Sequence, residues 1–233
     1  MIQLLTMTGA RPLAFSLCVR WMERQTYLGP VTWIIVDDGP EEIVPPSIRG
    51  WSVGVVRPTP RWSPGENTQA RNILAGLEVA STSSPLFVIE DDDWYSPDYL
   101  RAATDWAREA PLVGEGRARY YNVASRRGME HLNRDHASLC STGMDGSMIP
   151  AFRDAVNRRG RFIDIDLWAR AKHKKVFTGT HHCVGIKGLP GRPGIGMGHA
   201  PEFRGKSDPD GALLRSWIGN DAEVYLGQAC EAP

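Results

Sequence analysis

The most informative part of the chain is Leu86-Phe87-Val88-Ile89-Glu90-Asp91-Asp92-Asp93-Trp94-Tyr95-Ser96-Pro97, where a short apolar run ends abruptly in four consecutive carboxylates. Open α/β sheets bind ligands at the carboxyl ends of their strands, which is where this acidic run falls. Four like charges this close repel one another unless a cation joins them, and carboxylate oxygens suit Mg²⁺ or Mn²⁺. The alternative is a solvated acidic loop or helix N-terminus, where carboxylates are also favourable.

Three further apolar runs precede this one, at residues 2–7, 31–36 and 51–56. Helical spacing of apolar residues separates them, over residues 13–24 and from about residue 66 to residue 80. Short apolar runs that alternate with helical patterns indicate βαβ units. The sequence therefore predicts an α/β fold, with a mainly parallel, Rossmann-like sheet flanked by helices.

The second half of the chain has a looser pattern. We expect a helix up to residue 110, hairpins over 111–146, helices at 151–159 and 164–172, and a strand at 175–177. A Gly/Pro-rich loop at 185–198 and a helical end at 211–228 then follow.

Composition excludes several classes of protein. The 233 residues are 42% hydrophobic and 23% charged, so the chain is neither disordered nor a coiled coil. Lys plus Arg (27) equals Asp plus Glu (27), so no overall charge attracts it to polyanions. No apolar run approaches the ~20 residues that span a bilayer, so we expect a soluble, cytoplasmic protein. The four cysteines, the last being Cys230, lie far apart, which predicts reduced thiols.

A second acidic pair follows the run at 31–36, where Asp37 and Asp38 precede Gly39. Both acidic groups should face one crevice at the sheet edge. A carboxylate there can accept the imino hydrogen of a pyrimidine or a ribose hydroxyl, although an Asp-Gly turn that merely closes a strand is the alternative. Arg71, inside the next helix, could contact a nucleotide or form an ion pair with Asp38.

The Gly-rich stretch at 185–199 combines flexible backbone with cations and an imidazole. It is not a Walker loop, because Lys187 lacks the G-x-x-x-x-G before it and the Ser or Thr after it. A lid closing over a diphosphate would place Lys187 and Arg192 on phosphate oxygens and His199 on a metal. An ordinary surface loop is the alternative.

Together these motifs resemble a family-2 nucleotide-sugar glycosyltransferase of the GT-A fold. The resemblance rests on segments 6–12, 24–26, 35–39, 70–72 and 90–100, which follow one another in the family's order. It implies that the acidic run is the metal-binding D-x-D element, with Asp92 as the metal ligand and Asp93 or Asp91 as further possibilities. The residues assigned to the nucleotide are Thr8, Arg11, Asp37, Asp38, Arg71, Asp91, Lys187 and Arg192.

The resemblance continues in Phe162-Ile163-Asp164-Ile165-Asp166-Leu167-Trp168-Ala169-Arg170, which is similar to the family's Glu-Asp-x-Asp-Leu-Trp-x-Arg. By register, Asp164 is the acceptor-facing base, and a carboxylate at a helix N-terminus is ionised and positioned for that task. Helix capping is the alternative role for Asp164. Asp166 is assigned to the acceptor or sugar side, together with Trp94 and Trp168, which either stack on sugar rings or belong to the core.

These assignments predict one GT-A-like domain over 1–233, with a donor part at 1–110 and an acceptor part at 111–233. The expected reaction is metal-dependent, hexosyltransferase-like transfer from a nucleoside diphosphate sugar, with inversion and with UDP favoured because an Asp can accept the uracil N3 hydrogen. The alternatives are a retaining transferase, a sugar-phosphate nucleotidyltransferase, and a binding module for sugar nucleotide or nucleic acid. The acceptor stays open among a glycan, a lipid-linked glycan and a modified DNA base.

Overall fold

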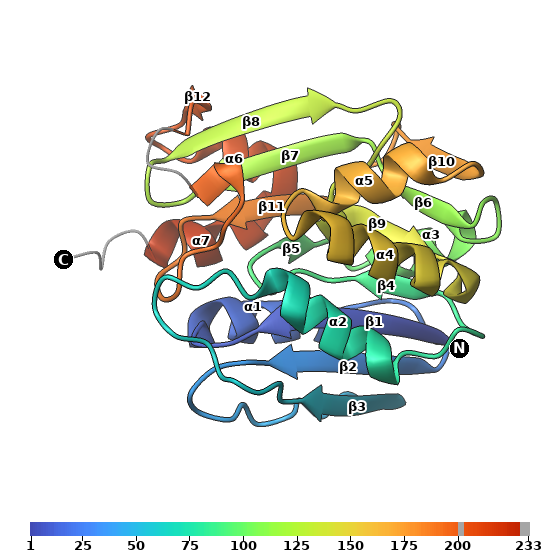
Figure 1. Cartoon of the computed structure of the whole chain (residues 1–233). Coiled ribbons are helices and arrows are strands. Elements are labelled where there is room, and N and C mark those ends of the chain that lie inside the picture. Colours follow the sequence, from blue (N-terminus) through green and yellow to red (C-terminus); the bar gives the residue numbers. More distant parts are fainter. Residues whose placement is uncertain (200–202, 229–233) are drawn as a thin grey trace.

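The computed structural model describes residues 1–199 and 203–228. Its centre is a seven-stranded sheet of order β10-β6-β9-β4-β1-β2-β3, beside a second sheet of order β12-β8-β7-β11-β5 (Figure 1). Among the described residues, the strands of the first sheet run parallel except for β9, which is antiparallel to β4 and β6. The prediction of a single α/β domain with a mainly parallel sheet flanked by helices is confirmed.

The strands of both sheets are β1 (Ile2–Thr8), β2 (Val31–Asp37), β3 (Trp51–Val56), β4 (Leu86–Val88), β5 (Trp94–Tyr95), β6 (Leu112–Glu115), β7 (Arg117–Asn122), β8 (Arg127–Leu132), β9 (Thr142–Met144), β10 (Lys174–Phe177), β11 (Cys183–Lys187) and β12 (Lys206–Ser207). The helices are α1 (Pro12–Glu23), α2 (Gln69–Val79), α3 (Tyr99–Trp106), α4 (Ile149–Arg159), α5 (Ile163–Arg170), α6 (Ala212–Ile218) and α7 (Ala222–Gln228). Short 3₁₀ turns occupy η1 (Leu139–Ser141), η2 (Gly146–Met148), η3 (Met197–His199) and η4 (Gly219–Asp221).

Alternation along β1 divides the core between the two faces of the main sheet. Successive strand side chains point to opposite faces, so Leu4 and Leu5 enter different clusters. Leu4 packs with Trp21 of α1 and with the buried residues of α3, whereas Leu5 packs with Ile73 of α2 and Phe152 of α4. The helices on both faces therefore hold the strand ends, and the residues that follow them, in fixed positions.

The four apolar runs predicted in the first half correspond to β1, β2, β3 and β4, and the two helical patterns to α1 and α2. The second half differs in three ways. The region 111–146 contains the expected hairpin, β7 with β8, but β6 and β9 join the main sheet. The start of the predicted Gly-rich loop is wrong, because residues 185–187 belong to β11, which is buried throughout. The C-terminal helix is interrupted at Gly219, whose φ of 61° ends α6.

Two further predictions concern the thiols and a membrane-spanning helix. Cys18, Cys140 and Cys183 are free and buried, and Cys230 lies outside the described residues. Within residues 1–199 and 203–228, every helix is too short or too polar to cross a membrane.

Phe152 offers a test of the packing between α4 and the main sheet. Its side chain is fully buried, so Phe152→Ala should lower the free energy of unfolding by about 3–5 kcal/mol through lost burial and a cavity. Phe162, which is 45% exposed, is the matched control, and Phe162→Ala should cost less than about 1 kcal/mol. Urea unfolding measures both values, and equal losses would contradict this packing.

Candidate functional site

A cavity of about 390 Å³ opens where β1 and β4 end. Of the residues that the sequence assigns to a site, the structure brings eight together in its lining: Thr8, Arg11, Asp91, Asp92, Asp164, Lys187, Arg192 and His199. They come from the first strand end, the acidic run, the start of α5 and the segment after β11. One cavity thus joins groups from residues 1–110 and from residues 111–233.

The three aspartates of the acidic run are buried, Glu90 is partly exposed, and cations from distant segments pair with them. Asp91 accepts hydrogen bonds from Thr8 Oγ1 at 2.8 Å and from Arg11 Nη1 at 2.6 Å. Burial, with repulsion from Asp92, raises the pKa of Asp91 to about 6 against the opposing effect of Arg11. Arg11 also reaches Asp92 Oδ2 at 2.8 Å, so one guanidinium bridges two neighbouring carboxylates.

Lys187 is the second cation of the acidic run. Its ammonium lies 2.8 Å from Asp93, 3.5 Å from Asp92 and 3.7 Å from Glu90. Burial opposes ionisation of Asp92, but Lys187 and Arg11 outweigh it and hold the pKa of Asp92 well below its ordinary value. Asp92 therefore stays a carboxylate facing the cavity.

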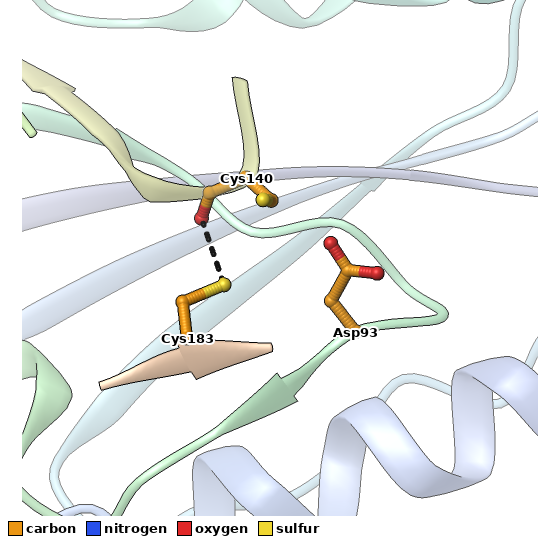
Figure 2. A group of neighbouring side chains, drawn as sticks. All are labelled: Asp93, Cys140 and Cys183. Atoms are coloured by element: carbon orange, nitrogen blue, oxygen red, sulfur yellow. Dashed lines mark hydrogen bonds between the residues drawn. The ribbon is translucent and has the colours of Figure 1, made fainter. Parts of the chain in front are cut away.

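Asp93 points away from the cavity, into the protein. Besides Lys187 it accepts the backbone N–H of Ile186 at 2.9 Å, which ties the acidic run to β11. Figure 2 shows its carboxylate near the side chains of Cys140 and Cys183, of which Cys183 Sγ donates to the Cys140 carbonyl. Burial raises the pKa of the Cys183 thiol to about 11, which keeps this thiol protonated at neutral pH.

The carboxylate of Asp38 is fully buried and lies outside the cavity lining. It pairs with Arg192 at 2.7 Å and Arg71 at 3.4 Å, and it accepts a hydrogen bond from Thr68. Arg192 also donates to Thr68 at 2.5 Å, and its guanidinium lies 4.7 Å from the ring centre of Trp62. The loop after β11 is therefore anchored on the group that the sequence assigns to a nucleoside.

Asp37 is separate from this arrangement, although it neighbours Asp38. It accepts the backbone N–H groups of Gly39 and Ile43 at 2.9 and 3.2 Å and lies 3.3 Å from Arg57. These contacts close the turn after β2. The structure thus separates the two adjacent acids, Asp37 toward the turn and Asp38 toward Arg192.

Asp164 lies at the start of α5 and lines the cavity. Burial, with a contribution from Glu90, raises its pKa above the ordinary value, while the N–H of Ile165 acts in the opposite direction. Asp166 points elsewhere, as its spacing predicted, and pairs with Arg158 and Arg170 at 2.9 and 3.2 Å.

The two tryptophans assigned to sugar stacking are buried outside the cavity lining. Trp94 is 5% exposed and donates its indole N–H to Asp221 at 3.0 Å. Trp168 is fully buried and donates to Thr142 at 3.1 Å. Both indoles have protein partners for their polar atom, which is the core role that the sequence left open.

Other lining residues were not singled out from the sequence. Tyr120 and Met129 are paired across β7 and β8, and His131 lies two residues further on the same face of β8. Phe162 is the most unusual, because it adopts φ 54° and ψ 45°, a left-handed conformation that bulky side chains seldom occupy. The sequence feature that could have identified Phe162 is its position as an aromatic residue directly before the Ile-Asp-Ile-Asp segment.

The carboxylates and the imidazole near the cavity differ in how well they suit a divalent cation. The carboxylates of Glu90, Asp92 and Asp93 are close enough to share an ion, but the ammonium of Lys187 already lies among them. Asp92 with His199, whose Nε2 lies 3.2 Å away, forms the fitting pair. Burial lowers the pKa of His199, so its imidazole is neutral near pH 7, and carboxylate with imidazole suits Mn²⁺.

Comparisons with known proteins identify the fold. No family model and no curated protein sequence matches the chain. Among solved structures it is similar to S. aureus TarS, with a TM-score of 0.54 and 8% identity over 79% of this chain and 36% of that one. It is also similar to TarS 1-349 in complex with UDP (TM-score 0.52, 9% identity, 80% of this chain, 60% of that one). For TarS 1-349 in complex with UDP-GlcNAc the TM-score is 0.54 and the sequence identity is 10%, and the match covers 86% of this chain and 61% of that one.

The chain thus spans between about a third and three fifths of the TarS chains that it matches. At such low identity the likeness concerns the fold, which is that of the glycosyltransferase TarS.

Proposed function

We propose that this protein transfers a sugar from a nucleoside diphosphate sugar, with UDP as the favoured nucleotide, to an acceptor hydroxyl. The observation that carries the proposal is the single cavity that Asp164 lines from one wall and the Arg11, Lys187 and Asp92 group from another. The fold adds support, because similar structures were solved with UDP and UDP-GlcNAc.

The donor diphosphate would lie against the cations of the cavity. Arg11 and Lys187 are fixed by buried carboxylates and still line the cavity, so they can stabilise the negative charge that grows on the leaving diphosphate. Thr8 donates a hydrogen bond to Asp91, which is the carboxylate that pairs with Arg11.

At the nucleoside end, Asp38 would accept the imino N–H of uracil. Arg192 occupies that carboxylate in the present structure, so donor binding would require Arg192 to leave Asp38 and move to the diphosphate. Arg71 could then remain as the ionic partner of Asp38.

Asp92 and His199 would hold the Mn²⁺ or Mg²⁺ that the sequence predicts. When bound, the ion would neutralise charge on the diphosphate as a Lewis acid.

On the acceptor side, Asp164 would take the proton of the attacking hydroxyl. Its pKa is raised mainly by burial, which makes it a stronger base than an ordinary Asp. Attack from the face opposite the leaving diphosphate gives inversion at the anomeric carbon, and the anomeric configuration of the product distinguishes this from a retaining transferase.

Asp164→Asn tests the assigned base. The substitution should leave UDP affinity unchanged and lower kcat by ~10² to 10⁴, the usual contribution of a positioned base. In the wild type, activity should fall as pH drops through the pKa of Asp164, at a higher pH than an ordinary Asp would give. The pH profile of kcat/KM measures this. Unchanged kcat with a lower melting temperature would instead identify a helix cap.

Arg192→Ala tests the exchange at the nucleoside end. Removing the guanidinium should weaken UDP binding several-fold, because a phosphate contact is lost. Uridine binding should stay the same or strengthen, because Asp38 no longer has to be released from Arg192. Calorimetry with UDP and uridine measures the two affinities. An equal loss for both ligands would show that Arg192 has only a structural role.

His199→Ala tests the metal pair. In the wild type, Mn²⁺ should increase UDP affinity, and in the variant this increase should disappear while metal-free UDP affinity is retained. Titration of UDP with and without Mn²⁺ provides the measurement. A full Mn²⁺ effect in the variant, or none in the wild type, would contradict the assignment of Asp92 and His199.

A further inference from the structure

Helices α4 and α5 and the start of β10 carry a concentration of positive charge that the whole chain does not have. Residues 153–175 contain eight Lys and Arg but three Asp, an excess of five positive charges in a chain with a net charge of zero. Asp166 is 6% exposed and lies within 4.0 Å of Arg158, Arg159 and Arg170. The single negative charge of Asp166 neutralises one of these three positive charges. The side chains of Arg158, Arg159 and Arg170 are 39%, 59% and 61% exposed, respectively. The cluster therefore presents uncompensated positive charge to solvent.

Phe162 places an aromatic ring at the cavity beside this charge. It immediately precedes α5, is 45% exposed and still lines the cavity that Asp164 lines. The guanidinium of Arg161 lies 4.9 Å from its ring centre, and the same group donates to the Ile195 carbonyl at 3.1 Å. A strained backbone at φ 54° that exposes a large aromatic side chain costs stability, and such strain concentrates at binding and catalytic sites.

From the exposed ring at the cavity and the exposed guanidiniums of α4 and α5, we infer that the acceptor hydroxyl is carried on a nucleobase of a single-stranded or locally opened DNA strand. Bases stack on aromatic side chains, and Arg near the ring adds to that stacking. Phosphates are neutralised by Lys and Arg along the strand. A neutral glycan would contact the ring of Phe162 but would gain nothing from the exposed arginines. A simple phosphate polymer would pair with the arginines but would not stack on the ring.

The inference rests on the proposed glycosyl transfer and specifies its acceptor. Phe162 would hold the base so that its hydroxyl meets Asp164. The hydroxyl oxygen forms the new bond to the anomeric carbon, its proton passes to Asp164, and the bond from that carbon to the diphosphate breaks with its electron pair on the diphosphate. Unmodified DNA bases carry no alcohol, so a reaction that installs a hydroxyl-bearing carbon on a base must supply this substrate.

Binding of two oligonucleotides of about 12 residues tests the inference, a length within the site sizes of single-strand binders. One is oligothymidine and the other has the same phosphates with abasic positions. Fluorescence anisotropy should show about tenfold tighter binding of oligothymidine, from base stacking. Phe162→Ala should remove that difference and leave abasic affinity unchanged.

The ionic part is tested by the double variant Arg159→Ala with Lys172→Ala, since both side chains are exposed. Between about 50 and about 200 mM salt, the double variant should bind both oligonucleotides more weakly. The magnitude of the slope of log affinity against log salt should fall by about 1.4, or about 0.7 for each lost phosphate contact. Arg101→Ala with Arg108→Ala is the matched control, because these exposed arginines belong to α3 and its end, on the other face of the main sheet. The control pair should change neither affinity nor slope.

Equal affinity for the two wild-type oligonucleotides would overturn the nucleobase in favour of a phosphate polymer. Affinity no greater than for a neutral oligosaccharide would overturn the nucleic acid altogether. UDP binding, measured by calorimetry on the same samples, separates the two proposals. UDP binding without DNA binding refutes only this inference, and DNA binding without UDP binding refutes the proposed transfer and leaves a nucleic-acid binding module.

Discussion

Burial of three consecutive acids, Asp91 to Asp93, is the constraint on which the rest of the structure depends. Buried carboxylates are costly unless cations and hydrogen-bond donors accompany them. The chain supplies Arg11 from the turn after β1 and Lys187 from the end of β11, nearly a hundred residues beyond the acids. Because Asp93 also accepts the N–H of Ile186, the acidic run joins the main sheet to the second sheet. The charges that suit a diphosphate site are thus also the contacts that assemble the fold.

The same cavity brings together residues from both halves of the chain. The N-terminal half provides the strand ends and the acids, whereas α5 and the segment after β11 close the cavity from the other side. Helix α5 is distant in sequence from the strand ends and the acids, but its packing, with α4, on the main sheet holds it in place. A ligand that spans the cavity would therefore contact both halves of the chain.

Local sequence patterns predict the elements of the first half of the chain, but they do not predict long-range strand pairing or the partners of buried side chains. Strands β1 to β4, helices α1 and α2 and the acids at strand ends follow from periodicity, because each is determined within a few neighbouring residues. Strands β6, β9 and β10 pair with partners distant in the chain, and periodicity carries no information about such pairing. Trp94 and Trp168 are core residues because Asp221 and Thr142 satisfy their indole N–H groups, contacts that only the folded chain reveals. The left-handed backbone of Phe162 likewise has no signature in its residue type.

The contact between Arg192 and Asp38 would have a consequence for turnover in the proposed transfer. The loop that carries Arg192 would compete with the nucleoside for Asp38, at a fixed and high effective concentration. While a diphosphate held Arg192, this competitor would be absent from Asp38. Once the diphosphate departed, the returning guanidinium would restore the charge balance of the buried Asp38 and prevent the nucleoside from rebinding. Product expulsion would then be driven by the protein's need to neutralise one buried acid.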